Sequence, residues 1–332
     1  MIPPVLPPAL KAALQAKLEG VSRSDAANRA ALISKTYRDG GGSRIIKTDA
    51  DALAYALARM PATYAAAIAT LNALSEIRPD FAPQTLLDIG AGPGTASFAA
   101  AEAFPTLTTF AMIDRNDALR ALALDLVRGQ ARMSGMTYLA ADIRALARVD
   151  AADLVVASYA IGEFPDADRR DITELMWHKT RDTLLLVEPG TPAGFARIIT
   201  ARTRLIGLGA HVAAPCPHDG PCPLVSPDWC HFTQRLARSR AHKEVKGAEL
   251  PFEDEKFAYV ALTRAPVTRH LARVLAQPSL SKIAVKAKLC TRTGVVTASI
   301  PHRDKKPYAR ARRWRWGDAV IEEAQPTQSV NP

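Results

Sequence analysis

The feature that most constrains the fold of this chain is a series of short apolar runs that alternate with helical sequence. Each run is followed by a glycine or a polar residue, and helical stretches such as 95–104 and 117–129 lie between runs. Strands that alternate with helices predict an α/β fold built on a parallel, doubly wound sheet. The expected strands cover 85–89, 109–113, 136–140, 154–158, 183–187 and, later in the chain, 257–262.

Helical sequence fills the chain before the first expected strand. We expect Ser24 and Asp25 to cap the second helix and Pro61 to start the last one, because these residue types favour helix N-termini. Three consecutive glycines between Asp39 and Ser43 predict a mobile loop. The expected helices cover 10–18, 26–37, a stretch from Asp49, and 62–75.

The overall composition is that of a globular protein with one main core. The chain has 332 residues, of which 48% are hydrophobic and 23% charged. No apolar run approaches the ~18 residues that a membrane span needs, and the N-terminus does not resemble a secretory signal. We therefore expect no membrane partner, a cytoplasmic protein (mitochondrial if the source is eukaryotic), and a monomer. The expected units are an N-terminal helical region (1–80), a main domain (81–265) that includes a cysteine loop (209–230), a basic β segment (266–320) and a disordered tail (321–332).

A glycine-rich loop follows the first expected strand and predicts a nucleotide-type cofactor site. The loop reads Asp88-Ile89-Gly90-Ala91-Gly92-Pro93-Gly94, and glycines here let the backbone turn sharply and approach a ligand. Thr95 stands where a dinucleotide fingerprint would have its third glycine. The form instead resembles motif I of the class I S-adenosylmethionine-dependent methyltransferases.

Acidic residues that end the next two strands support this interpretation. Asp114 ends the second strand, 24 residues after Gly90, where a carboxylate can accept hydrogen bonds from both ribose hydroxyls. Asp142, after the third strand, matches the position that faces the adenine amino group in that superfamily. The predicted cofactor-binding residues are Asp88, Gly90, Gly92, Gly94, Asp114 and Asp142.

The fourth strand supplies no recognisable catalytic motif. It continues as Ser158-Tyr159-Ala160-Ile161-Gly162-Glu163-Phe164-Pro165, which lacks the Asn-Pro-Pro-Tyr type of signature and has no cysteine. Glu163 is a candidate to orient a substrate or to close the cofactor pocket, and equally a carboxylate at the start of a helix. The catalytic residues are unknown.

All four cysteines fall in the last third of the chain. Cys216, Cys222, Cys230 and Cys290 suit zinc or an iron–sulfur cluster, and wide, proline-flanked spacing favours a loop around a larger cluster over a zinc knuckle. Four free thiols are the alternative. His218 and His231 are neighbouring candidate ligands, but ordinary hydrogen bonds suit them better.

The excess positive charge is concentrated near the C-terminus. The window from Ser281 to Gly317 holds eleven Lys or Arg and one acid, Asp304, whereas the rest of the chain has equal numbers of both signs. Such a patch, interleaved with Tyr308, Trp314 and Trp316, predicts RNA binding through phosphate contacts and base stacking, against the alternative of a solubilising tail. The densest part consists of Lys305, Lys306, Arg310, Arg312, Arg313 and Arg315.

Several of these motifs occur in one order that resembles a known family. The order runs from RMPATY (59–64) through LLDIGAGPGTASFAA (86–100), CPHDGPCPL (216–224), WCHF (229–232) and KGAELPFEDEKFAYVAL (246–262) to YAR (308–310) and WGD (316–318). Together these segments resemble the methyltransferase-like small-ribosomal-subunit family, whose mitochondrial members are ribosome assembly factors. The resemblance implies a class I methyltransferase fold that holds S-adenosylmethionine, and a [4Fe-4S] cluster on the four cysteines, Cys216, Cys222, Cys230 and Cys290. It also implies binding to small-subunit rRNA.

Three functions remain open at this point. The first is an S-adenosylmethionine-dependent methyltransferase that acts on rRNA in the small ribosomal subunit. The second is a catalytically inactive RNA-binding assembly factor with a structural cofactor and metal. A methyltransferase for a small molecule is the third, and in that case the basic segment would be dispensable for turnover.

Overall fold

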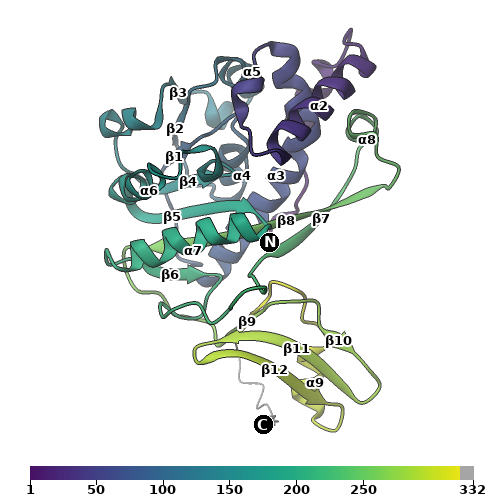
Figure 1. Cartoon of the computed structure of the whole chain (residues 1–332), viewed down its shortest axis with the longest axis vertical. Helices are drawn as coiled ribbons and strands as arrows, with labels where there is room; N and C mark the ends of the chain where they lie inside the picture. Colours follow the sequence, from purple (N-terminus) through teal and green to yellow (C-terminus); the bar gives the residue numbers. More distant parts are fainter. Residues whose placement is uncertain (322–332) are drawn as a thin grey trace.

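The computed structural model describes residues 1–321, except the side chains of residues 144 and 147, and shows a large α/β domain beside a small β domain (Figure 1). Within these residues the large domain is built on an eight-stranded sheet. Each of the predicted strands is present, and the late one is longer than expected. The strands are β1 (Thr85–Ile89), β2 (Thr109–Asp114), β3 (Thr137–Ala140), β4 (Ala152–Ser158), β5 (Thr180–Pro189), β6 (His211–Ala214), β7 (Phe232–Ala237) and β8 (Phe252–Thr263).

The strand order places a ligand-binding edge between β1 and β4. The order is β3-β2-β1-β4-β5-β8-β6, with β7 paired to β8 beyond this path. Strands β1 to β5 pair in parallel, whereas β8 runs antiparallel to β5, β6 and β7. The chain direction across the sheet reverses at β1 and β4, and ligands of doubly wound sheets bind at the carboxyl ends of strands at such a point.

Helices cover both faces of the sheet because successive side chains of a strand point to opposite sides. The helices that cover the sheet are α3 (Asp49–Ile77), α4 (Thr95–Ala103), α5 (Asp117–Val127), α6 (Arg169–His178) and α7 (Pro192–Ile206). On β1, Leu86 packs into the core that includes α3, α4 and α5, whereas Leu87 packs into the core that includes α6 and α7. None of the helices among the described residues is long and apolar enough to cross a bilayer.

The N-terminal region is helical as expected, but two predicted helix starts are wrong. Helix α1 (Pro8–Ala16) precedes α2 (Arg23–Arg38), which is capped by the Ser22 hydroxyl rather than by Ser24 and Asp25. Pro61 does not start a helix, because it lies inside the continuous α3. A proline in a helix interior removes one hydrogen bond. Burial of α3 along most of its length outweighs that loss, since Met60 and Ala62 are fully buried.

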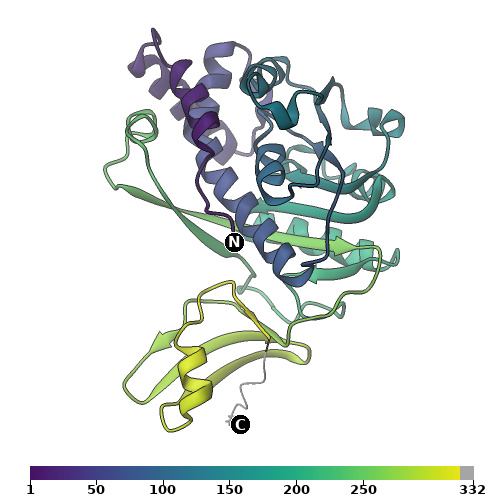
Figure 2. The ribbon, with the colours of Figure 1, turned by 180° about the vertical axis from the view of Figure 1, so that it is seen from behind.

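An arm leaves the sheet between β7 and β8. It carries the short helix α8 (Arg240–Lys246) at its far end, beside α2 (Figures 1 and 2). Arg23 of α2 pairs with Glu244 of α8 at 3.0 Å, and Val245 is buried against the main core. The arm therefore links the last strands of the sheet to the N-terminal helices.

The small domain has its own sheet and its own core. Val274, Val285 and Ala311 are fully buried in that core, and β11 and β12 form the antiparallel hairpin expected for 283–300. The tail predicted at 321–332 lies, beyond residue 321, outside the described residues. The elements are β9 (Ala272–Val274), β10 (Ser279–Leu280), β11 (Ala284–Thr291), β12 (Gly294–Pro301), α9 (Lys305–Ala311) and β13 (Ala319–Val320).

Candidate functional site

The glycine loop forms the sharp turn that its sequence predicts. Gly90, Gly92 and Gly94 have φ values of +69°, +52° and +81°, a region that residues with a Cβ rarely adopt. At Gly90 space is short as well, because an added Cβ would lie 2.5 Å from the Cβ of Ala160. The loop thus passes directly over the end of β4 and leads into α4.

Asp88 holds this loop against α4 from below. Its Oδ2 accepts hydrogen bonds from the backbone N–H of Ser97 (3.1 Å) and from the Ser97 hydroxyl (2.7 Å). Its Oδ1 is buried and has no hydrogen-bond partner among the described residues. Burial raises the pKa of Asp88 to about 7, so this carboxyl group titrates near neutral pH.

Asp114 at the end of β2 is fixed from two sides. Its Oδ2 accepts a hydrogen bond from the N–H of Gly92 (2.9 Å) and its Oδ1 from the N–H of Asn116 (2.8 Å). Burial raises the pKa of Asp114 as well, while these two donors act against the rise. The hydroxyl of Tyr138 donates to the Gly92 carbonyl (2.7 Å) and completes the support of the loop.

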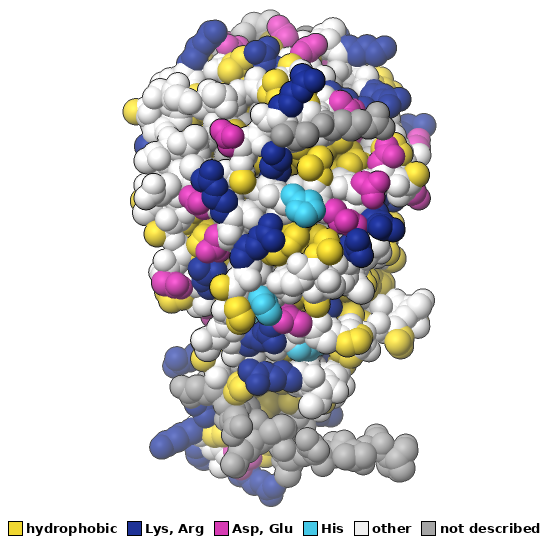
Figure 3. Space-filling view, turned by 90° about the vertical axis from the view of Figure 1, so that its left-hand side faces the viewer, with side chains coloured by type: hydrophobic (Ala, Val, Ile, Leu, Met, Phe, Trp, Pro, Cys, Tyr) yellow, Lys and Arg dark blue, Asp and Glu magenta, His cyan; other side chains and the backbone are white. Residues whose placement is uncertain are grey.

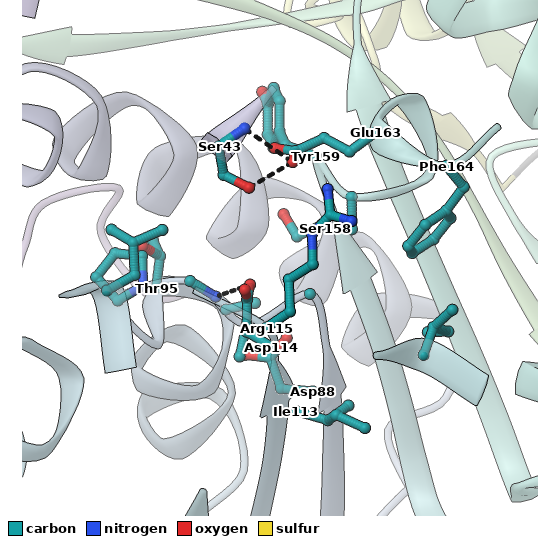
Figure 4. A pocket seen from close by; sticks show the side chains of 18 of the residues that line it. Ser43, Asp88, Thr95, Ile113, Asp114, Arg115, Ser158, Tyr159, Glu163 and Phe164 are labelled. Atoms are coloured by element: carbon teal, nitrogen blue, oxygen red, sulfur yellow. Dashed lines mark hydrogen bonds between the residues drawn. The ribbon is translucent and has the colours of Figure 1, made fainter. Parts of the chain in front are cut away.

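These residues line one cavity of about 300 Å³ at the carboxyl edge of the sheet (Figure 4). Of the predicted cofactor residues, Gly94 is not among those that line it and instead precedes α4 as its N-cap. The cavity is lined by acidic, aromatic and small side chains together. The predicted residues that line it are Asp88, Gly90, Gly92, Asp114 and Asp142.

The N-terminal region closes one side of this cavity, which the sequence did not predict. Glu163 accepts hydrogen bonds from the Tyr37 hydroxyl (2.8 Å) and from the N–H and hydroxyl of Ser43 (3.0 and 2.6 Å; Figure 4). The Asn116 amide donates to the carbonyls of Ser43 and Ile46, both at 2.9 Å. The segment expected to be a mobile loop is therefore held at its C-terminal end over the cavity.

The triple glycine before Ser43 is the sequence signal that could have located this contact. A Cβ on Gly42 would lie 2.8 Å from the Glu163 Oε2. A side chain at this position would have to displace the Glu163 carboxylate, so a glycine suits the close approach of the segment. Of the three roles open for Glu163, the structure matches closing the pocket.

The loop after β4 is held in place by buried charges behind it. Tyr159 has a φ of +57°, and no other non-glycine residue among those described has a positive φ. Its hydroxyl donates to Glu255 (2.8 Å), which also accepts from Arg59 (3.1 Å). The fully buried Glu188 accepts from the N–H of Ile161 (3.1 Å). Strained backbone of this kind is found at functional sites, and nothing in the local sequence indicated these partners.

The four cysteines meet at a second, smaller cavity of about 30 Å³ between the two domains. Cys216, Cys222 and Cys230 come from the loop between β6 and β7, and Cys290 comes from β11. All four are free thiols. Within residues 1–321, no group of three or more His, Cys, Asp or Glu side chains is arranged to hold a metal ion. Burial raises the pKa of the Cys290 thiol to about 12, so it is protonated at neutral pH unless something replaces the proton.

Two buried arginines line the same cavity. Arg202 of α7 and Arg273 of β9 are 2% and 1% exposed. Arg202 Nε and Arg273 Nη2 have no hydrogen-bond partner among the described residues. Cationic groups and thiols therefore lie together around one apolar space.

The two histidines considered as ligands make other contacts. The Nδ1 of His218 lies 3.2 Å from the Gly220 carbonyl, and its Nε2 lies 3.9 Å from the Cys290 Sγ. His231 stacks on Trp229, with ring centroids 5.0 Å apart, and meets Trp316 edge-on at 4.8 Å. His231 therefore joins the cysteine loop to the small domain by ring contacts.

The basic segment is exposed, but one of its three aromatic residues is buried and the other two are half-buried against neighbouring residues. Tyr308 is 8% exposed in the core of the small domain, Trp314 packs against that core, and the Trp316 indole donates to the His231 carbonyl (2.9 Å). The prediction that these rings stack on bases is wrong for Tyr308, because burial leaves its ring faces inaccessible. The six basic residues, Lys305, Lys306, Arg310, Arg312, Arg313 and Arg315, are all exposed. On the face drawn in Figure 3, Lys and Arg side chains surround the lower end, where the small domain lies.

The fold and the cofactor cavity together define a class of protein. The strand order with an antiparallel strand β8 between β5 and β6, the glycine loop after β1 and the carboxylate at the end of β2 are those of the class I methyltransferase-like proteins. A family model described as "Mitochondrial small ribosomal subunit Rsm22" matches residues 49–321. The chain belongs to this Rsm22 family, which confirms the resemblance seen in its sequence.

Curated relatives are longer than this chain. The human mitochondrial ribosome assembly protein METTL17 is 31% identical over 301 residues, which cover 82% of this chain and 63% of that protein. The Rsm22-cox11 tandem protein 2 of Schizosaccharomyces pombe, also mitochondrial, is 26% identical over 364 aligned residues, which cover 93% of this chain and 48% of that protein. These eukaryotic relatives are mitochondrial, which fits the mitochondrial alternative of the expected location and not the cytoplasmic one.

Solved structures resemble the large domain only in outline. A putative RNA methyltransferase from Pyrococcus horikoshii has a TM-score of 0.40 and 12% identity, covering 60% of this chain and 82% of its own. The magnesium protoporphyrin IX methyltransferase of Synechocystis with bound S-adenosylmethionine has the same TM-score and identity, covering 62% and 84%. The assignment of the class therefore rests on strand order and on the cavity.

Proposed function

We propose that this protein binds S-adenosylmethionine in the larger cavity and assists assembly of the small ribosomal subunit by binding its rRNA. The fixed carboxylate of Asp114, held by Gly92 and Asn116 at the rim of a 300 Å³ cavity, is the observation that carries the cofactor assignment. Membership of the Rsm22 family supports the ribosomal role, since the human relative is named as a ribosome assembly protein.

Each cavity residue has a distinct task in this proposal. Asp114 would accept hydrogen bonds from the ribose hydroxyls, and Asp142 would face the adenine amino group. Gly90 and Gly92 let the backbone come close to the ligand, and Asp88 keeps the loop in position through Ser97. When bound, S-adenosylmethionine supplies an electrophilic methyl group.

The cavity favours an assembly factor over a methyltransferase acting on rRNA. The Glu163 carboxylate follows β4, where the strand-end residues of such folds face the reacting groups, but three donors from Tyr37 and Ser43 already occupy it. A carboxylate that the chain itself occupies in this way positions the N-terminal segment rather than a substrate. The protein would then hold the cofactor as part of its structure.

We further propose that the four cysteines hold a [4Fe-4S] cluster, with zinc as the alternative. The fit is supported by the donors themselves: four free thiols around one apolar cavity, with two arginine side chains whose buried N–H groups lack partners. The thiols come from a long loop and from a strand of the other domain, rather than from a compact knuckle of the kind zinc favours. Cys216, Cys222, Cys230 and Cys290 would be the ligands, and they would join the two domains.

The rRNA would contact the exposed basic residues of α9 and the turn that follows. These residues lie on the small domain, away from the acidic cavity, so cofactor and RNA would bind to separate surfaces. Phosphate neutralisation by such a patch gives affinity that depends on salt rather than on base sequence.

One set of measurements on the anaerobically purified protein tests the proposal. Calorimetry should show S-adenosylmethionine binding, and metal analysis with an absorption spectrum should show iron and acid-labile sulfide. A methyl-transfer assay on immature small-subunit particles should show no incorporation above that of an Asp114→Ala variant. Incorporation that depends on Asp114 would show instead that the protein is a methyltransferase. Absence of cofactor binding would remove the assignment of the cavity.

A further inference from the structure

The two buried arginines beside the cysteines are unusual because, among the described residues, neither forms an ion pair with a carboxylate. Among the residues that the structure describes, neither Arg202 nor Arg273 lies within 4.0 Å of an Asp or Glu oxygen. Each is at most 2% exposed. A buried guanidinium stays charged and is strongly unfavourable without an anion close by.

Their hydrogen bonds go to backbone carbonyls and leave part of each guanidinium unused. Arg202 donates through Nη2 to the carbonyls of His218 and Gly220, both at 2.8 Å. Arg273 donates through Nε to the Pro215 carbonyl (2.9 Å) and through Nη1 to Gly317 (2.8 Å). The Nε of Arg202 and the Nη2 of Arg273 are buried without a partner.

The carboxylates that interact with Arg273 form no ion pair with it among the described residues. Glu76 and Asp318 interact with its charge from beyond ion-pair distance, and burial, which raises the pKa of both carboxyl groups, outweighs the opposing effect of Arg273. His270, which shares the Pro215 carbonyl with Arg273, is kept neutral by burial and adds no charge. The thiols at the cavity are therefore the remaining groups that can carry negative charge next to the arginines.

We infer that Arg202 and Arg273 are the counter-cations of an anionic tetrathiolate metal centre at this cavity. Four cysteine thiolates around zinc, or around an oxidised four-iron cluster, leave a centre with a double negative charge, which two guanidinium groups balance. The inference rests on the metal assignment proposed above, but it concerns what these arginines do rather than which metal is bound.

The hydrogen bonds of the two arginines also link the proposed metal centre to the junction between the two domains. Arg202 fixes the loop that carries Cys216 and Cys222, whereas Arg273 spans from Pro215 in that loop to Gly317 in the small domain, which supplies Cys290. Loss of the metal would leave both charges buried and uncompensated between the domains. The metal centre and the two arginines would then hold the domain junction together as a unit.

The test compares charge-removing and charge-retaining variants of the anaerobically prepared protein. We expect Arg273→Gln to lower the reduction potential of the cluster by about 59 mV, a tenfold change in the equilibrium of a one-electron couple. The change should also raise the rate of iron loss to a chelator about tenfold or more. Arg273→Lys keeps the charge and should stay close to the wild type in both measurements. Arg264→Gln, which removes a cation that packs on Trp177 away from the cavity, is the matched control.

The outcomes separate the counter-cation role of the arginines from the metal assignment on which it rests. Metal in the wild type with an unchanged potential and unchanged metal loss in Arg273→Gln and Arg202→Gln overturns the counter-cation role and leaves the metal site intact. If the metal is zinc, faster zinc loss in the Gln variants than in the Lys variants supports the same role. Wild-type protein without any metal overturns the metal assignment and the counter-cation role together. Should Arg273→Gln fail to fold, the Lys variant and Arg202→Gln still provide the comparison.

Discussion

The two cavities differ in how their polar groups are satisfied. At the larger cavity, Asp114 and Glu163 are each held by several donors of the chain itself, and the cavity lies within one domain. At the smaller cavity, two buried guanidinium groups each leave one nitrogen without a hydrogen-bond partner among the described residues. They lie beside four thiols from both domains, of which Cys290 is buried and the other three are half-buried. On the proposals above, the first site is formed by the chain alone, whereas the second needs an anionic occupant to balance its two arginines. A ligand of the first site should therefore add affinity but little structure, and a metal at the second should hold the fold together.

The largest expected effect follows from removing one thiol. Cys222→Ser should abolish the colour of anaerobically prepared protein and destabilise the loop from residue 209 to residue 230, since that loop has few large apolar residues of its own. Absorption spectra, iron and sulfide analysis and limited proteolysis would measure this. Val225→Ala in the same loop, at an exposed position, should change neither property. A stable, metal-free wild type would break the contrast between the cavities.

Removal of the exposed basic residues should give the next largest effect. Changing Lys305, Lys306, Arg310, Arg312, Arg313 and Arg315 to Ala should weaken RNA binding by orders of magnitude. It should also flatten a log–log salt slope of about −4, the value for six single-strand-type contacts. Filter binding at two salt concentrations measures both, and S-adenosylmethionine affinity should be unchanged.

A matched control uses exposed basic residues of the large domain that form ion pairs. Changing Arg23, Lys35, Arg128, Arg170, Arg235 and Arg240 to Ala should leave the salt slope near that of the wild type. Equal loss in both variants would show that net charge, and not the small domain, determines RNA binding.

A smaller effect is expected at the preformed cavity. Asp114→Ala should weaken S-adenosylmethionine binding by roughly 1–3 kcal/mol, because the ribose would lose a charged acceptor. Calorimetry measures the change, and Asp171→Ala on the exposed side of α6 serves as the control. In the absence of ligand, Asp114→Ala should change the melting temperature much less than Cys222→Ser does. Unchanged affinity would remove Asp114 from the site.

The smallest effect concerns the pH dependence of stability. The pKa of Asp88 is about 7 in the folded protein against 3.8 without burial, so the folded state holds a proton that the unfolded state releases. Its contribution to stability is therefore present below pH 4 and is lost as the pH rises towards 7. Asp88→Asn should remove this loss, and its melting temperature relative to the wild type should rise between pH 5 and pH 8. A constant difference across that range would show that Asp88 is not protonated in the fold.

Local sequence patterns were sufficient for the strands and for part of the site. The alternating apolar runs predicted all the parallel strands, because side chains buried on both faces leave a continuous apolar signal. The glycine loop and Asp114 were predicted because a backbone turn and a carboxylate at a strand end depend on neighbours in the chain. The same reasoning failed at Pro61, where a proline ordinarily ends a helix but the buried surroundings of α3 keep it continuous.

Contacts between distant segments could not be predicted in this way. The pairing of Glu163 with Tyr37 and Ser43 joins residues more than a hundred positions apart, and the network of Tyr159, Arg59 and Glu255 is equally non-local. Nothing in the sequence next to Arg202 and Arg273 signals that these two residues are buried. Tyr308 of the basic segment was misjudged for the same reason, because only the packing of the small domain decides that it is buried.

The sequence by itself therefore determined the sheet, the glycine loop with its strand-end acid, the grouping of cysteines late in the chain and the location of the positive charge. These features depend on the chemistry of residues that are adjacent or regularly spaced. The tertiary structure alone decided that the N-terminal helices close the cofactor cavity, that the cysteines of two domains meet, and that two arginines are buried beside them. Burial and charge balance are properties of the packed chain, because they depend on which surfaces exclude water when distant segments come together.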